Sequence, residues 1–338
     1  MKNIIALGND ACRALGIVPH NNPGTLVHGQ VCLANDSLFS QATFSQEVTT
    51  FGIGYTDPNR NRLMELLNFI APTRNGPRNA IVTVYDEDEP FEAVDPAKVK
   101  RAILADFPEV KQRTSTKTTR ALANRGLTLV LDNDQLKEKP NWETMHAAWL
   151  MDLLARASII EAVALFRAMS PSSAVIWDAL ANPDLDVKST NISVLAPTTG
   201  FKANRALMGE EVTLLRQLAY EARNDPGGVA GALAQTDEQV ATRMGLDRVR
   251  TNAERYNNGG SKDTFLGNSL LLFTAQDQES PEDASNIVRH VSNTDFGGGN
   301  YATYIERKQK KTLITVENYE LLAVQHTSGA AELTVTGV

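Results

Sequence analysis

Cysteine is scarce in this sequence. Cys12 and Cys32 are the only two among 338 residues, so no framework of disulfide bonds is expected to support the fold. Such sparse cysteine is typical of proteins kept in a reducing compartment. Residues 1–16 also lack the sustained apolar stretch of a secretory signal peptide. We therefore expect a protein that is made and kept in a cytoplasm.

Positive charge is in deficit. The chain has 33 Lys and Arg against 40 Asp and Glu, a net charge of -7. A dedicated nucleic-acid binder usually shows a basic excess, so the balance argues against that class and leaves only weak contact through local patches. One short basic patch is present, and it fits either a solvated turn between strands or a contact with packaged nucleic acid or a neighbour's acidic surface: Arg307, Lys308, Lys310 and Lys311.

Long hydrophobic runs are missing as well. The longest charge-free apolar pieces fall short of the ~20 residues that a bilayer span requires, so no contact with a membrane is predicted. The sequence shows no internal repeat and no low-complexity tract. Hydrophobic residues make up 42% and charged residues 22%, which is ordinary for a globular protein. The length allows two domains or one elaborate domain.

Motifs for nucleotide binding and for catalysis are not found. Gly8–Ala11 and Gly52–Gly54 fall short of the glycine-rich loops that cradle phosphates. Ser170, Ser172 and Ser173 lack the context of a nucleophile elbow. The five histidines share no motif. We therefore predict no catalytic residues, no cofactor and no enzymatic activity.

Metal binding has only weak support. Four residues near the N-terminus carry suitable ligand atoms, but their spacings do not match a zinc finger: Cys12, His20, His28 and Cys32. The carboxylate run Asp86–Glu89 carries the oxygen ligands that divalent cations prefer, but a solvated run or a patch facing another subunit explains it better. No metal site is predicted.

The most informative stretch is Asn141–Met169. It contains no Gly or Pro and is rich in good helix formers, Asn141 can cap its start, and Ser170-Pro171 stops it. A helix of this length spans roughly 40 Å. Its apolar stripe is broad, so we expect other elements to cover it on most sides, with four residues in its core: Trp149, Leu153, Ile160 and Phe166.

Roughly the first quarter of the chain has a sequence poorly suited to form an independent core. Residues 1–77 are punctuated by Gly and Pro and fit an extended arm, with one short helix over Arg60–Phe69. Asn79–Tyr85 and Gly126–Asp132 read as strands flanking a long polar excursion, which predicts an extended hairpin. One limb is acidic and the other basic, and we expect both to contact a neighbouring molecule: Asp86, Glu87, Asp88, Glu89, Lys111, Arg113, Lys117 and Arg120.

The remainder reads as a mixed helix and strand region. Thr236–Met244 is predicted as a helix with a capping box at Thr236 and Gln239 and a C-cap at Gly245. Lys202–Tyr220 is predicted as a further helix, and Asn257–Lys262 as a turn-rich loop. The predicted strands are Ile192–Leu195, Leu246–Arg250, Leu270–Thr274, Asn300–Glu306, Thr312–Glu317, Leu321–His326 and Ala331–Val335.

The order of these parts resembles the major capsid protein family of tailed bacteriophages, the Hong Kong 97-type fold. Asn79–Tyr85 resembles the first limb of the family's extended loop, and Asn141–Met169 resembles its spine helix. Val175–Asp178 with Asn182–Val187 resembles the entry to the domain at the capsomer axis. Later pieces resemble a strand and helix of that domain, and then its strand, loop and strand: Val194–Pro197, Ala203–Leu207, Val240–Val249, Asn252–Asn257 and Phe265–Asn268.

The resemblance covers residues 78–330 and implies an α+β fold in five parts. These are an N-terminal arm (1–77), an extended hairpin loop (78–132), a peripheral domain with the spine helix (133–180), an axial domain (181–299) and the return strands of the peripheral domain (300–338). Residues 1–77 match no motif of the family. Some relatives crosslink a loop lysine to a neighbouring subunit, but no motif selects any of the loop lysines here: Lys98, Lys100 and Lys111.

The resemblance also implies a structural function. Copies of the chain would assemble into hexamers and pentamers of an icosahedral shell around double-stranded DNA, in a virion assembled in the host bacterial cytoplasm. The implied partners are other copies, a scaffold, a portal and decoration proteins. Two alternatives stay open: an encapsulin-like shell that loads a protein cargo, and a cytoplasmic α/β enzyme. The size of the particle would separate the enzyme from both shells.

Overall fold

The structure, a computed structural model, describes residues 42–44, 58–85, 99, 115–136, 142–223, 235–278, 283–292 and 300–337. The chain divides into two compact units. Unit 1 comprises residues 1–54, 126–150 and 302–317, and unit 2 comprises residues 55–125, 151–301 and 318–338. Several residues considered above lie outside the described residues: Gly8–Ala11, Cys12, His20, His28, Cys32, Gly52–Gly54, Asp86–Glu89, Lys98, Lys100, Lys111 and Arg113.

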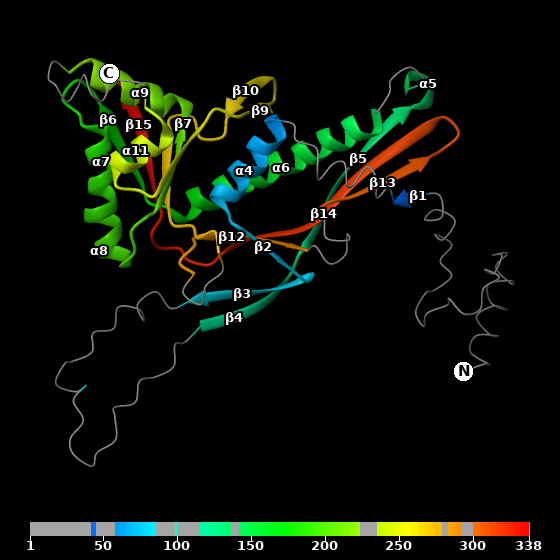
Figure 1. Cartoon of the computed structure of the whole chain (residues 1–338), viewed down its shortest axis with the longest axis horizontal. Helices are drawn as coiled ribbons and strands as arrows, with labels where there is room; N and C mark the ends of the chain where they lie inside the picture. Colours follow the sequence, from blue (N-terminus) through cyan, green and yellow to red (C-terminus); the bar gives the residue numbers. More distant parts are fainter. Residues whose placement is uncertain are drawn as a thin grey trace, which may run out of the picture. The chain divides into compact units, whose positions relative to one another are not determined.

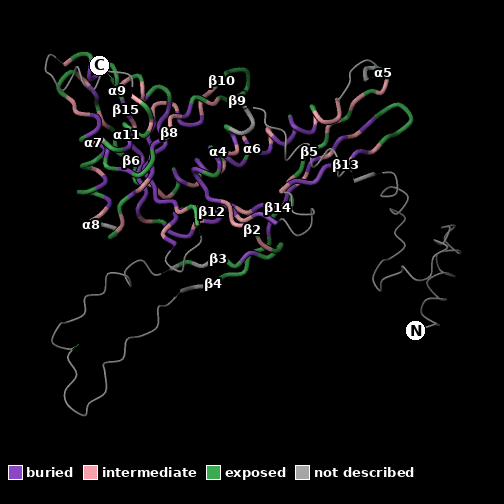
Figure 2. Tube along the Cα trace, in the orientation of Figure 1, coloured by how far each residue is buried: buried purple, intermediate pink, exposed green. Residues whose placement is uncertain are grey.

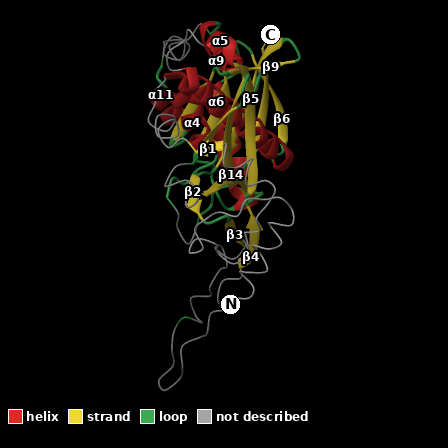
Figure 3. Ribbon diagram, turned by 90° about the vertical axis from the view of Figure 1, so that its right-hand side faces the viewer, coloured by secondary structure: helices red, strands yellow, loops and turns green. Residues whose placement is uncertain are grey.

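The described part of the chain contains both helices and strands, with long runs of strands between the helices, so the fold class is mixed α+β, as expected (Figure 3). Three of the described elements, all labelled in Figure 1, have residues in both units: the strands β5 (Ala123–Asp132) and β14 (Lys311–Val324) and the helix α6 (Trp142–Met169). The 28-residue length of α6 confirms the long helix predicted from the absence of Gly and Pro. Thr312–Glu317 and Leu321–His326, predicted as two strands, form most of the single strand β14.

Unit 1 is built on an antiparallel strand pair. β13 (Ala302–Arg307) pairs with β14, with Ala302 opposite Glu317 and Arg307 opposite Thr312, and β1 (Ala42–Phe44) pairs with β13. Asn133, in the short helix α5 (Asn133–Leu136), donates to the carbonyl of Lys308 at 3.0 Å and accepts from the Thr312 hydroxyl at 2.6 Å. These bonds fasten α5 to the turn between β13 and β14.

Unit 2 contains a five-stranded sheet in the order β6-β15-β11-β7-β8. β11 is antiparallel to both of its neighbours, while β6 is parallel to β15 and β7 is parallel to β8. The strands are β6 (Ser172–Trp177), β15 (Ala331–Gly337), β11 (Ser269–Phe273), β7 (Arg205–Gly209) and β8 (Arg248–Asn252).

The central strand β11 is covered on both faces. All five of its residues are buried. Leu271 and Phe273 belong to a core cluster with α4 (Pro58–Ile70) and the second half of α6. Leu270 and Leu272 belong to another cluster with α9 (Glu210–Glu221) and α11 (Asp237–Met244). Helices therefore pack on both faces of the central part of this sheet. β11 and β7 are buried along their whole length, whereas the edge strand β6 is mostly exposed (burial is coloured in Figure 2).

Unit 2 contains four further strand pairings among the described residues. β12 (Ile287–Ser292) pairs antiparallel with the second part of β14 and parallel with β2 (Thr73–Gly76). β3 (Asn79–Tyr85) and β4 (Ser115–Ala121) form a two-stranded sheet, which confirms the strand expected at Asn79–Tyr85. β9 (Arg255–Asn258) and β10 (Ser261–Thr264) form a hairpin where a turn-rich loop was predicted.

A fully buried ion pair lies between β12 and β14. The Arg289 guanidinium is 2.8 Å from a Glu320 carboxylate oxygen, and neither side chain is exposed. Asn318 donates to the same carboxylate at 2.9 Å, and Arg125 lies 3.8 Å from it. Burial would raise the pKa of Glu320, but the charge and hydrogen bond of Arg289 outweigh it and the pKa is lowered.

Two local predictions are wrong. Ile192–Leu195 is not a strand but part of a helical run made of α7 (Pro183–Ser189), the π-helical turn η2 (Thr190–Leu195) and α8 (Ala196–Thr199). Lys202–Tyr220 is helical only from Glu210, because Arg205–Gly209 forms the buried strand β7. The resemblance of these segments to a strand followed by a helix is corrected to a helix followed by a strand.

Two positions in or beside these elements depend on glycine. The capping box at Thr236 and Gln239 is present, and Gly245 ends α11 with a φ of 71°, as predicted. Gly209 lies where β7 passes the chain at Gly267. A Cβ on Gly209 would sit 2.0 Å from the Gly267 carbonyl oxygen, so no larger residue fits there without moving the backbone.

The prediction that all four chosen residues of α6 lie in the core is wrong for two of them. Phe166 is fully buried, but Trp149 is 48% and Ile160 is 40% exposed, and Leu153 is only partly buried. The buried face is formed instead by smaller or differently placed residues, including Ala155, Ile159 and Ala162. The apolar stripe is broad, as predicted, but the part of the chain that the structure describes covers only one side of it.

Replacing Glu320 with Gln tests the buried ion pair. The variant leaves Arg289 as a buried charge without its carboxylate, so we expect the free energy of unfolding at pH 7 to fall by about 3 kcal/mol. The pKa of Glu320 is lower in the folded state than in the unfolded state. Its contribution to the free energy of unfolding is therefore fully present above the unfolded-state pKa, and it is lost as the pH falls through the lower folded-state pKa. Urea unfolding followed by tryptophan fluorescence should show a smaller loss of stability from pH 7 to pH 3 for Glu320→Gln than for the wild type.

The exposed carboxylate of Asp247 provides the control for this comparison. Asp247→Asn makes the same change of charge at the surface and should change the stability at pH 7 by less than about 0.5 kcal/mol. Equal stabilities of Glu320→Gln and Asp247→Asn at pH 7 would contradict a stabilising role for the pair.

Candidate functional site

Several large apolar side chains of unit 2 between residues 176 and 218 are exposed. Exposed apolar side chains that lie together usually mark interaction surfaces. The most exposed is Leu180, at 92%. The full set is Ile176, Leu180, Leu185, Ile192, Val194, Leu214 and Leu218.

A tight turn holds Leu180 in its exposed position. The Asp178 carboxylate accepts the backbone N–H groups of Leu180 at 2.8 Å and Ala181 at 3.0 Å, and Ala181 also donates to the Asp178 carbonyl at 3.2 Å. An aspartate bonded in this way to its own following backbone is a common turn device. The exposed leucine is therefore presented by an ordered turn.

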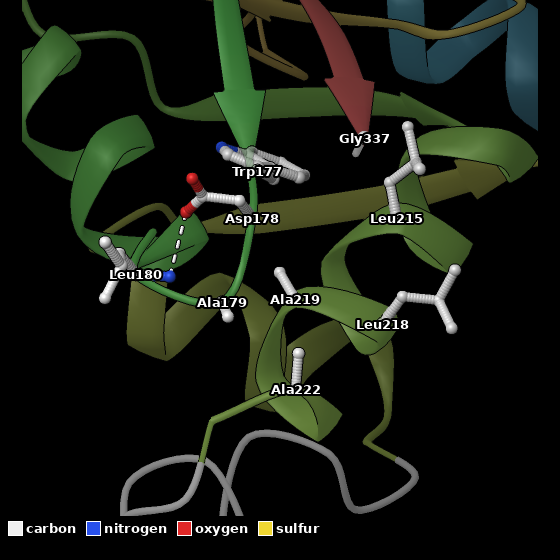
Figure 4. A pocket seen from close by; sticks show the side chains of 9 residues that line it. All are labelled: Trp177, Asp178, Ala179, Leu180, Leu215, Leu218, Ala219, Ala222 and Gly337. Carbon is white, nitrogen blue, oxygen red and sulfur yellow. Dashed lines mark hydrogen bonds between the residues drawn. The ribbon is translucent and has the colours of Figure 1, made fainter.

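An apolar hollow of about 440 Å³ lies beside this turn (Figure 4). The helix α9 lines one side with Leu215, Leu218 and Ala219, and Ala222 follows at its end. The last residues of the parallel strands β6 and β15 close the other side. The described residues that line it are Trp177, Asp178, Ala179, Leu180, Leu215, Leu218, Ala219, Ala222 and Gly337.

Two features set the shape of the hollow. Gly337 lets Leu215 pack against the end of β15, because a Cβ on Gly337 would lie 2.5 Å from a Leu215 methyl group. Ala219 and Ala222 are small, so α9 leaves open space where longer side chains would fill it. The hollow therefore follows from small residues placed opposite the 2%-exposed Trp177.

A buried polar cluster fixes α9 behind the hollow. Arg216 of α9 donates to both carboxylate oxygens of Asp184 at 2.7 and 3.0 Å, and Arg243 of α11 pairs with the same carboxylate at 2.7 Å. Tyr220 donates to the Asn182 side chain at 3.0 Å. Burial, together with the nearby Asp184 carboxylate, raises the pKa of Tyr220. The cluster ties α7, α9 and α11 together, so the hollow has a rigid wall.

The chemistry of this site favours an apolar partner. Its lining is dominated by Leu, Ala and Trp, and the Asp178 carboxylate is engaged within its own turn. No group of three or more His, Cys, Asp or Glu residues that could hold a metal ion occurs in the described part of the chain. Over the same residues, no helix has the length and apolarity to cross a bilayer.

The hairpin residues proposed as contacts are described only in part. Lys117 and Arg120 are exposed on β4, and Ile81 and Val84 of β3 are 61% and 41% exposed. Asp86, Glu87, Asp88, Glu89, Lys111 and Arg113 lie outside the described residues. The structure thus shows a two-stranded sheet with apolar and basic side chains facing solvent, and the contacts themselves stay a prediction.

Sequence reasoning missed Leu180 and the hollow. The sequence feature that could have indicated them is a leucine within a short connection of otherwise small and polar residues, Asp178–Pro183. Leucine has no role in turn formation, unlike the Asp, Asn and Pro around it. A leucine in that position is either folded back into the core or exposed, and only the structure shows that it is exposed.

Known proteins resemble this chain in structure and not in sequence. No family model matches the chain, and no curated protein matches its sequence. A phage-related protein from Bordetella bronchiseptica superimposes with a TM-score of 0.59 at 11% identity, over 86% of this chain and 96% of that protein. The chain thus shares its fold with a phage-related protein.

Two further solved structures are similar at lower TM-scores. The capsid of the cyanophage P-SCSP1u has a TM-score of 0.48 and 8% identity, over 80% of this chain and 87% of that one. An encapsulin complex from Synechococcus elongatus has a TM-score of 0.43 and 12% identity, over 78% of this chain and 84% of that one.

The turn at Asp178 can be tested by amide exchange. Asp178→Ala removes a carboxylate that accepts two backbone N–H groups, and each bond contributes about 1 kcal/mol. We expect the Leu180 and Ala181 amides to exchange about fivefold faster or more, with unchanged exchange in β11. Hydrogen exchange with mass-spectrometric detection measures both regions together. Asp178→Asn keeps an acceptor oxygen and should lie close to the wild type; unchanged exchange in the alanine variant would show that the carboxylate does not hold the turn.

Proposed function

We propose that this chain is the major capsid protein of a tailed phage or prophage, and that it assembles into an icosahedral shell enclosing double-stranded DNA. One observation carries the proposal: the fold is shared with a phage-related protein over 86% of this chain and 96% of that protein. The structural similarity covers nearly the whole length of the phage-related protein, so it is not limited to a small motif that many folds share. The role is structural and not enzymatic, and the shell lies in the virion after assembly in the host bacterial cytoplasm.

The surface of the chain supports a role in assembly. The two-stranded β3–β4 sheet exposes Ile81 and Val84, α6 exposes Met145, Trp149 and Ile160, and residues 176–218 expose a third apolar set. Two strands alone are marginally stable in water, so the β3–β4 sheet would gain from lying on another molecule. In this proposal neighbouring copies cover these surfaces, as hexamers and pentamers of the shell.

The parts of the chain take the following roles in the proposal. Residues 1–77 form an arm over neighbours, 78–132 the extended hairpin, 133–180 the peripheral domain with α6 as its spine, 181–299 the axial domain, and 300–338 the return strands. Asp86–Glu89 would face basic residues of a neighbour, and Lys117 and Arg120 would face acidic ones. Such exposed pairs set register and partner choice more than affinity, since each contributes at most ~1 kcal/mol.

The proposed partners are other copies, a scaffold, a portal, decoration proteins and the packaged DNA. The net charge of -7 suits a wall that encloses DNA without binding it tightly, because phosphate binding requires clustered Lys and Arg. An encapsulin-like shell with a protein cargo is the alternative function, and its contents would distinguish it from a phage capsid.

Electron microscopy and size-exclusion chromatography of the purified full chain test the proposal. We expect megadalton particles with closed, icosahedral outlines, alone or after co-expression with a scaffold. Particles that hold protein in place of nucleic acid would favour the encapsulin alternative. A protein that stays monomeric or dimeric under every assembly condition would contradict both shells and favour a discrete enzyme.

The exposed face of α6 predicts a variant that folds but does not assemble. Trp149 is 48% exposed, so Trp149→Glu should leave the melting temperature of the free subunit within about 3 °C of the wild type. The buried charge would cost several kcal/mol at a subunit contact, so we expect few or no particles by electron microscopy. Trp149→Phe keeps an apolar ring and should assemble. Normal shells from Trp149→Glu would show that this face is not a contact.

A further inference from the structure

Three polar atoms in the interior of unit 2 are buried and have no hydrogen-bond partner among the described residues: Arg289 Nε, Asn318 Oδ1 and Glu320 Oε1. Their side chains meet at one carboxylate, because Glu320 Oε2 accepts from Arg289 at 2.8 Å and from Asn318 at 2.9 Å. We propose that these three atoms form a binding site for one water molecule, which accepts from Arg289 and donates to Asn318 and Glu320. The site belongs to the folded subunit and does not depend on the shell function.

The depth of the three side chains is the first reason for this site. Arg289 and Glu320 are 0% exposed and Asn318 is 1% exposed, so bulk solvent does not reach them. Nearly all buried polar atoms in native proteins bond to protein or to ordered water. A buried water typically makes about three hydrogen bonds to groups that would otherwise be unpaired. Three such atoms on neighbouring side chains match that number.

The unused half of the Arg289 guanidinium shows where the water binds. The Nε–H and one Nη2–H of a guanidinium point in the same direction, like the prongs of a fork. Arg216 uses both prongs on Asp184, with Nε on one oxygen at 2.7 Å and Nη2 on the other at 3.0 Å. Arg289 places only Nη2 on Glu320, so its Nε–H points alongside that bond and lacks an acceptor. A water between Nε and Oε1 completes this second fork.

The neighbouring side chains do not take the place of the water. Arg125 lies 3.8 Å from Glu320 Oε1, which is too far for a hydrogen bond. The Ser158 hydroxyl lies near the same carboxylate, but it donates to a backbone carbonyl one turn earlier in α6, at 3.2 Å. Tyr301 lies near Arg289, whose Nε is still without a partner among the described residues.

The chemistry of the three atoms selects water over an ion. The amide nitrogen of Asn318 faces the carboxylate, which can only accept when ionised, so the amide oxygen is an acceptor directed elsewhere. The site therefore offers one N–H donor and two oxygen acceptors, which a single water satisfies with its oxygen and its two hydrogens. A cation would meet the charge of Arg289, and an anion would meet the charge of Glu320.

An experimental structure of the full chain, at a resolution that shows ordered waters, tests the site. The expected result is a density peak within about 3.2 Å of all three atoms. The Arg216–Asp184 pair is the internal control, because its direct bonds leave no place for a water between the paired atoms. A map that shows other buried waters but no peak here, or Arg289 Nε bonded directly to Glu320 Oε1, would overturn the proposal.

A variant tests the role of Asn318 in the same maps. Asn318→Leu has a similar size and removes one acceptor, so the peak should be lost. Asn258→Leu makes the same change in the exposed β9–β10 hairpin and should keep the peak. An unchanged peak in Asn318→Leu would overturn the three-bonded site. If that variant does not fold, the map of the wild type decides.

Nuclear magnetic resonance provides a second measurement on free subunits with isotope-labelled arginine. The Arg289 Nε–H should show a cross-relaxation peak with water, and the Arg216 Nε–H should not. The comparison is repeated in Ser158→Ala, which removes a nearby hydroxyl proton that could relay the signal. Peaks of equal strength at Arg289 and Arg216, or loss of the Arg289 peak in Ser158→Ala, would overturn the proposal.

Discussion

Burial of the strand β11 on both faces is the constraint on which unit 2 depends. The ring of Phe273, the last residue of β11, lies 5.7 Å from the ring of Phe69 on α4 and 4.9 Å from the ring of Phe166 on α6. Leu270 and Leu272 point to the opposite cluster with α9 and α11. Removing the helices from either face would expose a continuous apolar strand, so the position of each helix is coupled to the others through β11.

This arrangement explains why the exposed apolar surface lies where it does. The second half of α6 uses one face for the Phe273 cluster, which leaves Ile160 on the other face. Likewise α9 directs Val212 and Ala219 into the core and leaves Leu214 and Leu218 outside. Each helix is apolar on more sides than its own sheet can cover. Contacts with further molecules are the physical explanation for the excess.

The elements with local signals could be predicted from the sequence. The long helix α6 begins and ends within one residue of the prediction because proline-containing boundaries and helix-forming residues define it. The capping box of α11 and its Gly245 cap were recognisable for the same reason, since their interactions join residues close in sequence. The fold class followed from the order of such elements.

Elements that depend on distant contacts could not be predicted. β7 is buried on both faces and shows no alternation, so it was merged with the helix that follows it. Ile192–Leu195 has the composition of a strand, but Asn191 exchanges two hydrogen bonds with the backbone of Ala203, at 2.8 and 2.9 Å, and this contact supports the helical run. The exposure of Trp149 and Leu180 depends on which surfaces the rest of the chain covers, and composition carries no such information.

The close passage of Gly209 against Gly267 has a consequence for genetic studies of assembly. A Cβ atom at position 209 would lie 2.0 Å from the carbonyl oxygen of Gly267 and would collide with it. Substitutions at this position should therefore abolish particle formation as completely as the loss of a subunit contact. Gly209 nevertheless lies at the end of a buried strand and touches no neighbour in the proposal. A map of the positions at which substitution abolishes particle formation would therefore include residues required for subunit folding as well as residues required for contacts between subunits. Only the yield of soluble, folded subunits separates the two groups.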